Sequence, residues 1–274
     1  MDPAAKGIRE ARGGDLLPRC LLALGLVLAA VPVAVLLLST AVGGPLTYDL
    51  ADALSAWSGP WRVYRGVMSR LAMPSLLLIL VVMVVALWRA HRRAAFVLAL
   101  TVLLANLTVQ AIKHSPVVPA RQLALIDPMS GHVGVAAAMA LGWVVVGPAR
   151  AKAVSALCAV AAITGVSLGV VLAGWHTLPQ VVCPLVICMG WSVAAATLVP
   201  AEGGSRWATT AGLRRGGIVV SLVSAIGFTA LTLLAQPPPT GGGLVPSLLT
   251  LTGLLVVVAS LAAVGTVLAV GRTA

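Results

Sequence analysis

Long runs of apolar residues dominate the sequence, and they limit what the chain can fold into. The hydrocarbon core of a bilayer is about 30 Å thick, and a helix needs roughly 20 apolar residues to cross it. No Asp, Glu, Lys or Arg interrupts the runs. We therefore expect an all-α integral membrane protein with about eight transmembrane helices. The runs fall at about 20–43, 71–88, 94–112, 133–147, 154–174, 178–200, 217–235 and 247–270.

The composition supports the membrane assignment and argues against other classes. The chain is 60% hydrophobic and only 9% charged, whereas about a quarter of the residues of soluble domains are charged. Strands are a poor alternative, because the runs lack the alternation of barrel strands. The net charge of +11 does not indicate nucleic acid, since no basic run is long enough to follow a phosphate backbone. The four cysteines lie inside apolar runs and are interpreted as buried hydrophobes.

The distribution of Lys and Arg predicts the orientation, because cytoplasmic loops are enriched in them. With the N-terminus in the cytoplasm, the outer segments hold only Arg62, Arg65, Arg70, Lys113 and Arg121. We therefore expect a multi-pass plasma-membrane protein with both termini in the cytoplasm. The other basic residues fall in inner segments: Lys6, Arg9, Arg12, Arg19, Arg89, Arg92, Arg93, Arg150, Lys152, Arg206, Arg214, Arg215 and Arg272.

Two outer segments differ in character. The first, residues 47–70, carries Trp57, Trp61 and Tyr64 between charged residues, which is typical of a helix in the headgroup layer. It would serve as an anchor or as a gate for substrate. The second, residues 236–247, is rich in proline and glycine and is expected to set the last two helices apart. The chain thus divides into a basic cytoplasmic N-terminus (1–19), a six-helix membrane core (20–200), a cytoplasmic loop (201–216) and two further helices with a short tail (217–274).

The polar residues suited to binding or catalysis gather at the outer face in this predicted topology. Ser130, Gly131 and His132 directly precede an apolar run. A glycine there lets a ligand approach the backbone, and the free N–H groups of a first helical turn attract anions. Ser130 is expected to cap the helix and to donate to a phosphate oxygen. The alternative is a plain capped helix start with an incidental histidine.

A second outer feature is His176, which follows Gly174 and Trp175 at a membrane border. An ionisable ring at that depth usually has a function. The alternative is an interfacial histidine beside an anchoring tryptophan. Lys113 and Arg121 belong to the same outer face, although they come from a separate loop.

The order of these residues resembles a known family. Lys113 with Arg121, then Ser130–His132, then Gly174–His176 followed by Gln180, resemble the three signatures of the type 2 phosphatidic acid phosphatase (PAP2) superfamily, as in a divergent bacterial member. The resemblance covers roughly residues 45–200. The sequence departs from the family pattern at several positions. Arg121 lies eight residues after Lys113 instead of seven and no proline follows it, Met129 replaces a proline, Gly169 and Val170 replace Ser-Arg, and Gln180 replaces an aspartate.

The resemblance implies hydrolysis of a lipid phosphate or diphosphate through a phosphohistidine. His176 would attack phosphorus, with Gln180 orienting its ring, and His132 would protonate the leaving alcohol. The phosphoryl oxygens would be held by Lys113, Arg121, Ser130 and Gly131. Phosphoryl transfer needs these parts: donors on the oxygens, an in-line nucleophile and an acid for the leaving group. The scheme requires no metal or other cofactor, and the partners are the lipid substrate and the surrounding membrane lipids.

Three other interpretations stay open. Because the third signature lacks its Arg and Asp, the protein could be a degenerate relative that binds lipid phosphates or partner proteins without turnover. A small transporter is less well supported, since no apolar run carries a charge in mid-membrane. A metal site built from His114, His132, His176 and Asp127 is conceivable, but no close ligand pair supports it.

Overall fold

The computed structural model describes residues 58–114, 129–148 and 151–199, together with isolated residues between 21 and 25 and between 255 and 266. In this part of the chain every regular element is a helix and none is a strand, which confirms the all-helical class for it. The runs at 20–43 and 217–235 lie outside it, so the total of eight spans stays a prediction. The helices are α4 (Ser58–Ala90), α5 (Arg92–Lys113), α6 (Gly131–Val146), α7 (Lys152–Leu172) and α8 (Leu178–Ala196).

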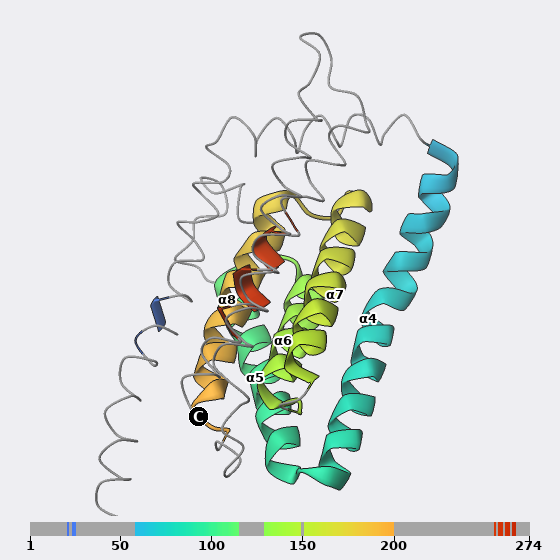
Figure 1. The fold of residues 1–274 in the computed structure, drawn as a ribbon. Helices are drawn as coiled ribbons and strands as arrows, with labels where there is room; N and C mark the ends of the chain where they lie inside the picture. Colours follow the sequence, from blue (N-terminus) through green and yellow to red (C-terminus); the bar gives the residue numbers. More distant parts are fainter. Residues whose placement is uncertain are drawn as a thin grey trace, which may run out of the picture.

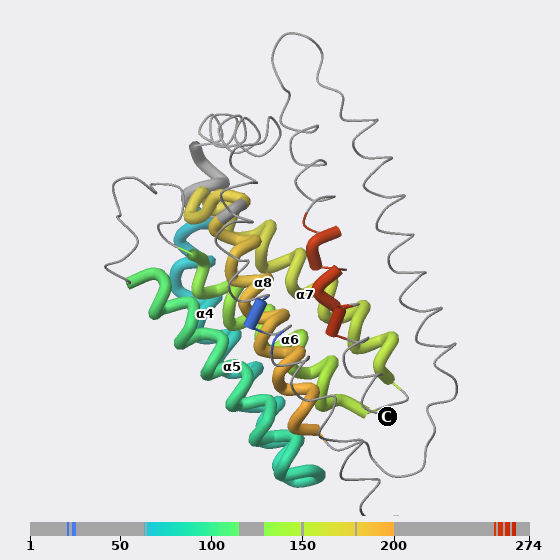
Figure 2. The backbone as a smooth tube through the Cα atoms, turned by 90° about the vertical axis from the view of Figure 1, so that its left-hand side faces the viewer, coloured from blue at the N-terminus to red at the C-terminus, as the bar shows by residue number. Residues whose placement is uncertain are grey.

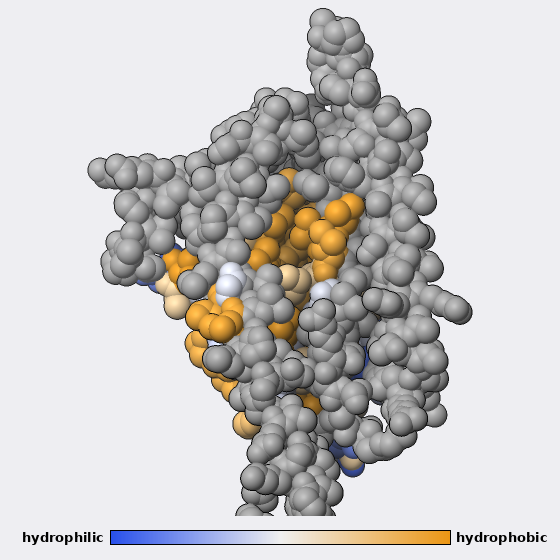
Figure 3. Space-filling model, turned by 60° about the vertical axis from the view of Figure 1, so that its left-hand side comes forward, coloured by the Kyte–Doolittle hydropathy of each residue, from blue (hydrophilic) through white to orange (hydrophobic). Residues whose placement is uncertain are grey.

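Three of these helices are long and apolar enough to cross a membrane: Arg65–Ala90 within α4, then α5 and α7. The apolar helices Gly131–Val146 and Gln180–Ala196 are shorter. Large apolar side chains remain exposed along the outside, for example Leu78 on α4 at 66% and Val154 on α7 at 62%. Where described side chains are visible in Figure 3, many are apolar. Apolar surface of this extent is unfavourable in water and is satisfied by lipid.

The helices alternate in direction, and α6 is the central one (Figures 1 and 2). It packs against α5, α7 and α8 and, less extensively, against α4. Small residues allow this central position. A Cβ added at Gly142 would lie 2.8 Å from Leu98 Cδ1, so α5 and α6 approach closely there. This arrangement brings the start of α6 to the same end of the bundle as the end of α5, the end of α7 and the start of α8.

Two side-chain hydrogen bonds connect α8 to its neighbours. Trp191 Nε1 on α8 donates to Thr108 Oγ1 on α5 at 3.0 Å. Cys188 Sγ donates to the carbonyl of Gly134 on α6 at 3.3 Å. In an apolar surrounding such bonds fix one helix relative to another, because the same groups have no water to bond instead.

Lys152 caps the C-terminal end of α6, at the opposite end of this helix from Gly131. Its Nζ donates to the carbonyls of Val144 at 2.5 Å and Val145 at 2.7 Å, and the side chain is only 4% exposed. A cation is favourable at a helix C-terminus, where carbonyls lack intrahelical partners. Lys152 was expected in an inner basic loop, whereas in the structure it is the first residue of α7 and its side chain is buried.

The beginning of α4 differs from the prediction. Residues 58–70 were placed in an outer segment separate from the span at 71–88, whereas α4 continues from Ser58 to Ala90 over 33 residues. A helix of that length measures about 50 Å, well beyond a 30 Å hydrocarbon core. Trp57 and the side chains of Trp61 and Tyr64 lie outside the described part, so the anchoring and gating roles remain untested.

The last predicted span is partly described, and it packs against the core. Leu255, Ala259 and Ala263 are fully buried in the main hydrophobic cluster with residues of α5, α6 and α8. A Cβ added at Gly265 would lie 3.4 Å from Met189 Sδ of α8. This stretch therefore contacts the helical core directly instead of standing apart from it. The proposed two-helix unit as a whole is not tested, because its first helix lies outside the described residues.

Candidate functional site

The start of α6 carries Ser130, Gly131 and His132. Ser130 is the N-cap: its backbone is extended, with φ −70° and ψ 111°, and its Oγ accepts the N–H of Val133 at 3.3 Å. This confirms the predicted cap. The serine is fully buried. Ser130 therefore satisfies one of the free N–H groups of the first turn from a position inside the protein.

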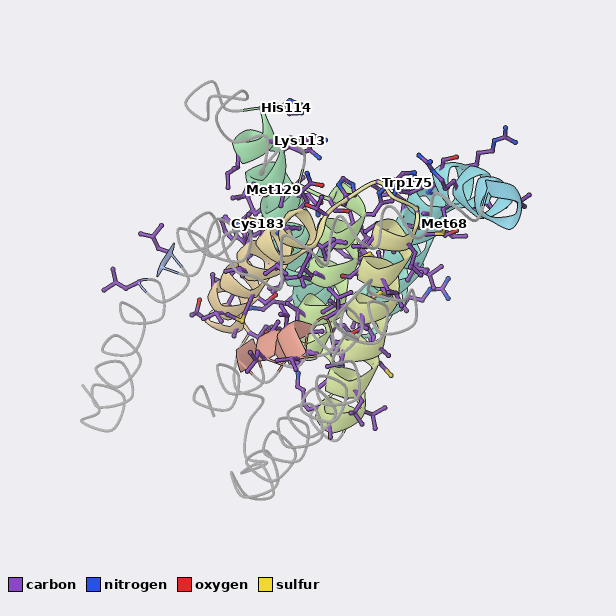
Figure 4. The ribbon with its side chains drawn as sticks, turned by 90° about the horizontal axis from the view of Figure 1, so that it is seen from above. Met68, Lys113, His114, Met129, Trp175 and Cys183 are labelled. Atoms are coloured by element: carbon purple, nitrogen blue, oxygen red, sulfur yellow. The ribbon has the colours of Figure 1, made fainter. Side chains whose placement is uncertain are left out.

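Met129, the residue before Ser130, packs at the start of α6. Its side chain is fully buried and packs with Val109 of α5 and with Cys183 and Ile187 of α8. Figure 4, which looks down on this end of the bundle, labels Met129 and Cys183 there. The methionine side chain thus supplies an apolar contact that holds the start of α6 between two neighbouring helices.

The turn between α7 and α8 positions Trp175 and His176. Gly174 has φ +67°, a left-handed conformation that glycine adopts without steric cost. The N–H of Gly174 donates to the carbonyl of Val171 at 2.8 Å, and that of Trp175 to Val170 at 3.1 Å. These two bonds form a Schellman motif, which ends a helix and turns the chain away from its axis. The residues that follow are thereby held close to the end of α7.

A capping box begins α8 immediately after His176. Thr177 is the N-cap, and Gln180 Oε1 accepts the Thr177 N–H at 2.9 Å. Gln180 is 7% exposed. The amide that we expect to orient His176 therefore also closes the first turn of α8.

Two contacts join the start of α6 to the turn between α7 and α8. The backbone N–H of Ser130 donates to the carbonyl of Gln180 at 2.9 Å. The rings of His132 and Trp175 lie 5.5 Å apart between centroids, tilted by 31°, within the usual range for paired aromatic rings. The structure therefore brings the second and third predicted signatures together, although they are more than 40 residues apart in the sequence.

The first signature meets the same end of the bundle through α5. Lys113 is the last residue of α5 and is half-buried. One turn before it, Gln110 Nε2 lies 3.7 Å from where a Cβ on Gly131 would be. Figure 4 shows Lys113 and His114 at the tip of α5, with Trp175 across α6 from them. Arg121 lies outside the described residues, and so does Asp127.

Other polar residues at this end were not foreseen. Trp175 was interpreted only as a membrane anchor, and Thr177 and Gln110 were not considered. The signal for Thr177 was available, because Thr-x-x-Gln at a helix start is the capping-box pattern. No comparable signal exists for Gln110, whose position depends on how α5 and α6 pack.

A metal centre finds no support in the described part of the chain, where no three His, Cys, Asp or Glu side chains gather closely enough to hold an ion. The chain matches no protein-family model, no curated protein and no solved structure. The case for a function therefore rests on the residues of this chain and their geometry.

Proposed function

We propose that the protein is a membrane phosphatase that hydrolyses a lipid phosphate or diphosphate at the extracytoplasmic face through a phosphohistidine. One observation carries the proposal. The segments with the two expected catalytic histidines meet at one end of the bundle, joined by the bond from Ser130 to Gln180 and by the His132–Trp175 ring contact. Neither contact was used to recognise the sequence signatures, so the two contacts support the proposal independently of the sequence.

Each residue has a defined task in this mechanism. His176 attacks phosphorus and becomes the phosphohistidine, and His132 protonates the departing alcohol. Lys113 and Arg121 neutralise the phosphoryl oxygens, and the first turn of α6 at Gly131 offers backbone N–H groups to them. His132, now neutral, then takes a proton from water as the water oxygen displaces the His176 nitrogen from phosphorus, which releases phosphate and regenerates both histidines. Phosphoryl transfer depends mainly on positioning and charge, so these groups include each type of residue that the reaction needs.

A lipid is the natural substrate because of where the residues lie. Those that the structure describes sit at the ends of the apolar helices α5, α6, α7 and α8, of which α5 and α7 are long enough to span a bilayer. A phosphate attached to a lipid is held at that depth by its own chains. A soluble phosphate ester would have to reach the same place against the cost of leaving water.

A second candidate function is binding without turnover, as in a degenerate member of the same superfamily. Two observations favour it. Ser130 is fully buried with its Oγ engaged in capping α6, and Gln180 Oε1 is engaged in capping α8. Gln180 also cannot supply the negative charge that would favour a cationic histidine.

Release of inorganic phosphate from a panel of lipid phosphates and diphosphates separates the two functions. Purified protein should release phosphate. His176→Ala should reduce the rate to background, and His132→Ala should reduce it by about 10²–10⁴-fold, the usual contribution of a general acid. His114→Ala is the matched control, because His114 is exposed at the end of α5 and has no assigned task. Equal rates for all three variants would refute hydrolysis at this site, and tight lipid-phosphate binding without release would establish the second function.

The orientation is tested separately. Single cysteines introduced at positions 122 and 238 of a cysteine-free variant should react with an impermeant thiol reagent on intact cells. A cysteine at position 205 should stay unlabelled until the cells are opened. Labelling at 205 alone would place the histidines on the cytoplasmic side and refute the extracytoplasmic site.

A further inference from the structure

A groove of about 410 Å³ lies between α4, α6 and α7. Its walls are almost entirely apolar, and its position alongside transmembrane helices makes it accessible to lipid. Ligand-binding pockets commonly measure about 300–1,000 Å³, so this one has room for part of a lipid but not for a large soluble molecule. The groove exists because α4 packs against α5 and α6 and makes little contact with α7 (Figure 1).

The wall formed by α6 begins one helical turn after His132. Ala136, Ala140 and Trp143 line the groove, and they follow His132 by 4, 8 and 11 residues. This spacing places all four residues on one face of the helix. From His132 to Trp143 the helix rises about 16 Å, which is about half of a 30 Å hydrocarbon core. The groove therefore begins about one helical turn from His132 and follows α6 for about 10 Å, while a lipid chain that starts at His132 would cover about half of the core along the same face.

The wall formed by α7 leads to the other half of the site. Cys158, Ala162 and Val166 line the groove at intervals of four residues, and α7 continues from them toward the turn at Gly174. Trp175 follows that turn and contacts the His132 ring, so α6 and α7 both connect the groove to the candidate site. Val166 is the lining residue of α7 nearest to this turn, eight residues before Gly174.

Small side chains keep the groove open. Ala136, Ala140 and Ala162 contribute only a methyl group each, and Ala162 and Cys158 are exposed. Larger side chains such as Ile79 of α4 form the opposite wall. A hydrocarbon chain satisfies such a surface, since it has no polar groups that would lose hydrogen bonds in the groove.

We propose that this groove holds one hydrocarbon chain of the lipid phosphate whose head group lies at His132. The inference rests on the proposed function for the identity of the head group and extends it to the tail. It makes the protein selective for substrates with a long chain, because only these fill the groove while the phosphate is at the site.

Filling the groove tests this selectivity. Ala162→Phe and Ala140→Phe place a ring inside it. Ala161→Phe is the matched control, since Ala161 is exposed on the same helix but does not line the groove. Both groove variants should raise KM for a long-chain phosphate monoester at least tenfold and leave hydrolysis of a short-chain, water-soluble monoester unchanged. The control should behave as the wild type with both substrates. Equal losses on both substrates, or no change with the long-chain one, would overturn the proposal.

Alkylation of Cys158 tests the groove without requiring hydrolysis. Cys183 and Cys188 are buried, and Cys158 is exposed, so a Cys20→Ser variant reports on Cys158. A long-chain alkyl phosphate should slow alkylation severalfold, and the alcohol of the same chain length should slow it much less. Equal protection by the alcohol would show a general lipid contact and overturn the proposal, as would no protection by either.

The two experiments separate the groove from the enzyme activity. If no phosphate is released from any lipid but the long-chain phosphate still protects Cys158, the proposed hydrolysis fails and the groove stands. If phosphate is released while Cys158 stays unprotected and both phenylalanine variants retain the wild-type KM, the groove proposal fails and hydrolysis stands.

Discussion

Replacing Gly174 by alanine should destabilise the protein through the backbone alone. Gly174 has φ +67°, and no atom lies within 4 Å of where a Cβ would be. The added methyl group therefore meets no neighbour, and its cost is that of a left-handed conformation for an L-residue, about 1–2 kcal/mol. Gly174→Asn should recover part of this loss, because asparagine tolerates that conformation better.

Gly165 provides the matched control. It lies within α7, and a Cβ there also meets nothing within 4 Å, but its backbone is helical. Gly165→Ala should therefore stabilise the protein by roughly 0.5–1 kcal/mol. The assay is thermal unfolding of the purified variants in one detergent, where 1 kcal/mol corresponds to roughly 2–4 °C in domains of 150–250 residues. The reasoning is refuted if Gly174→Ala melts at or above the temperature of Gly165→Ala.

Three further predictions follow from the contacts of the bundle. Lys152→Met should lower the melting temperature by several degrees, since it removes charge-assisted bonds of about 1.5–3 kcal/mol from the end of α6; an unchanged melting temperature would contradict the cap. Trp191→Phe and Thr108→Val should show a coupling of about 0.5–1.5 kcal/mol in a double-mutant cycle, the value of one hydrogen bond; additive effects would mean that the bond contributes nothing. Gln180→Glu should raise turnover at least tenfold, because a carboxylate favours a cationic His176 and still caps α8 as the third residue of a capping box. Gln180→Asp should raise turnover less, since its shorter side chain reaches neither the His176 ring nor the Thr177 N–H as well. A larger increase for Gln180→Asp than for Gln180→Glu would contradict the dual role of Gln180.

The helices were predictable where apolar length alone defines them. The runs at 94–112, 133–147 and 154–174 match α5, α6 and α7 within a few residues, because hydropathy directly reports which residues can lie in lipid. The start of α4 was not predictable in this way. Arg62, Arg65 and Arg70 lower the hydropathy of residues 58–70, although nothing in that segment stops a helix from continuing.

The site was predictable in its residues and only partly in its contacts. The cap at Ser130 follows from a serine three residues before the start of an apolar run, which is a local pattern. The contact between His132 and Trp175 depends instead on the left-handed turn at Gly174 and on α6 lying between its neighbours. Glycine allows that turn but does not by itself specify it, and helix packing is a property of the whole bundle.

The most direct test of the proposed mechanism is to identify the covalent intermediate. Protein mixed with a lipid phosphate labelled at phosphorus should be stopped in alkali, which preserves a phosphohistidine, and then digested and mapped. The account predicts an acid-labile label on the peptide that contains His176, absent from His176→Ala and present in His114→Ala. Phosphate release by the wild type with an equal label on the His176→Ala variant, or with the label on another residue, would contradict it.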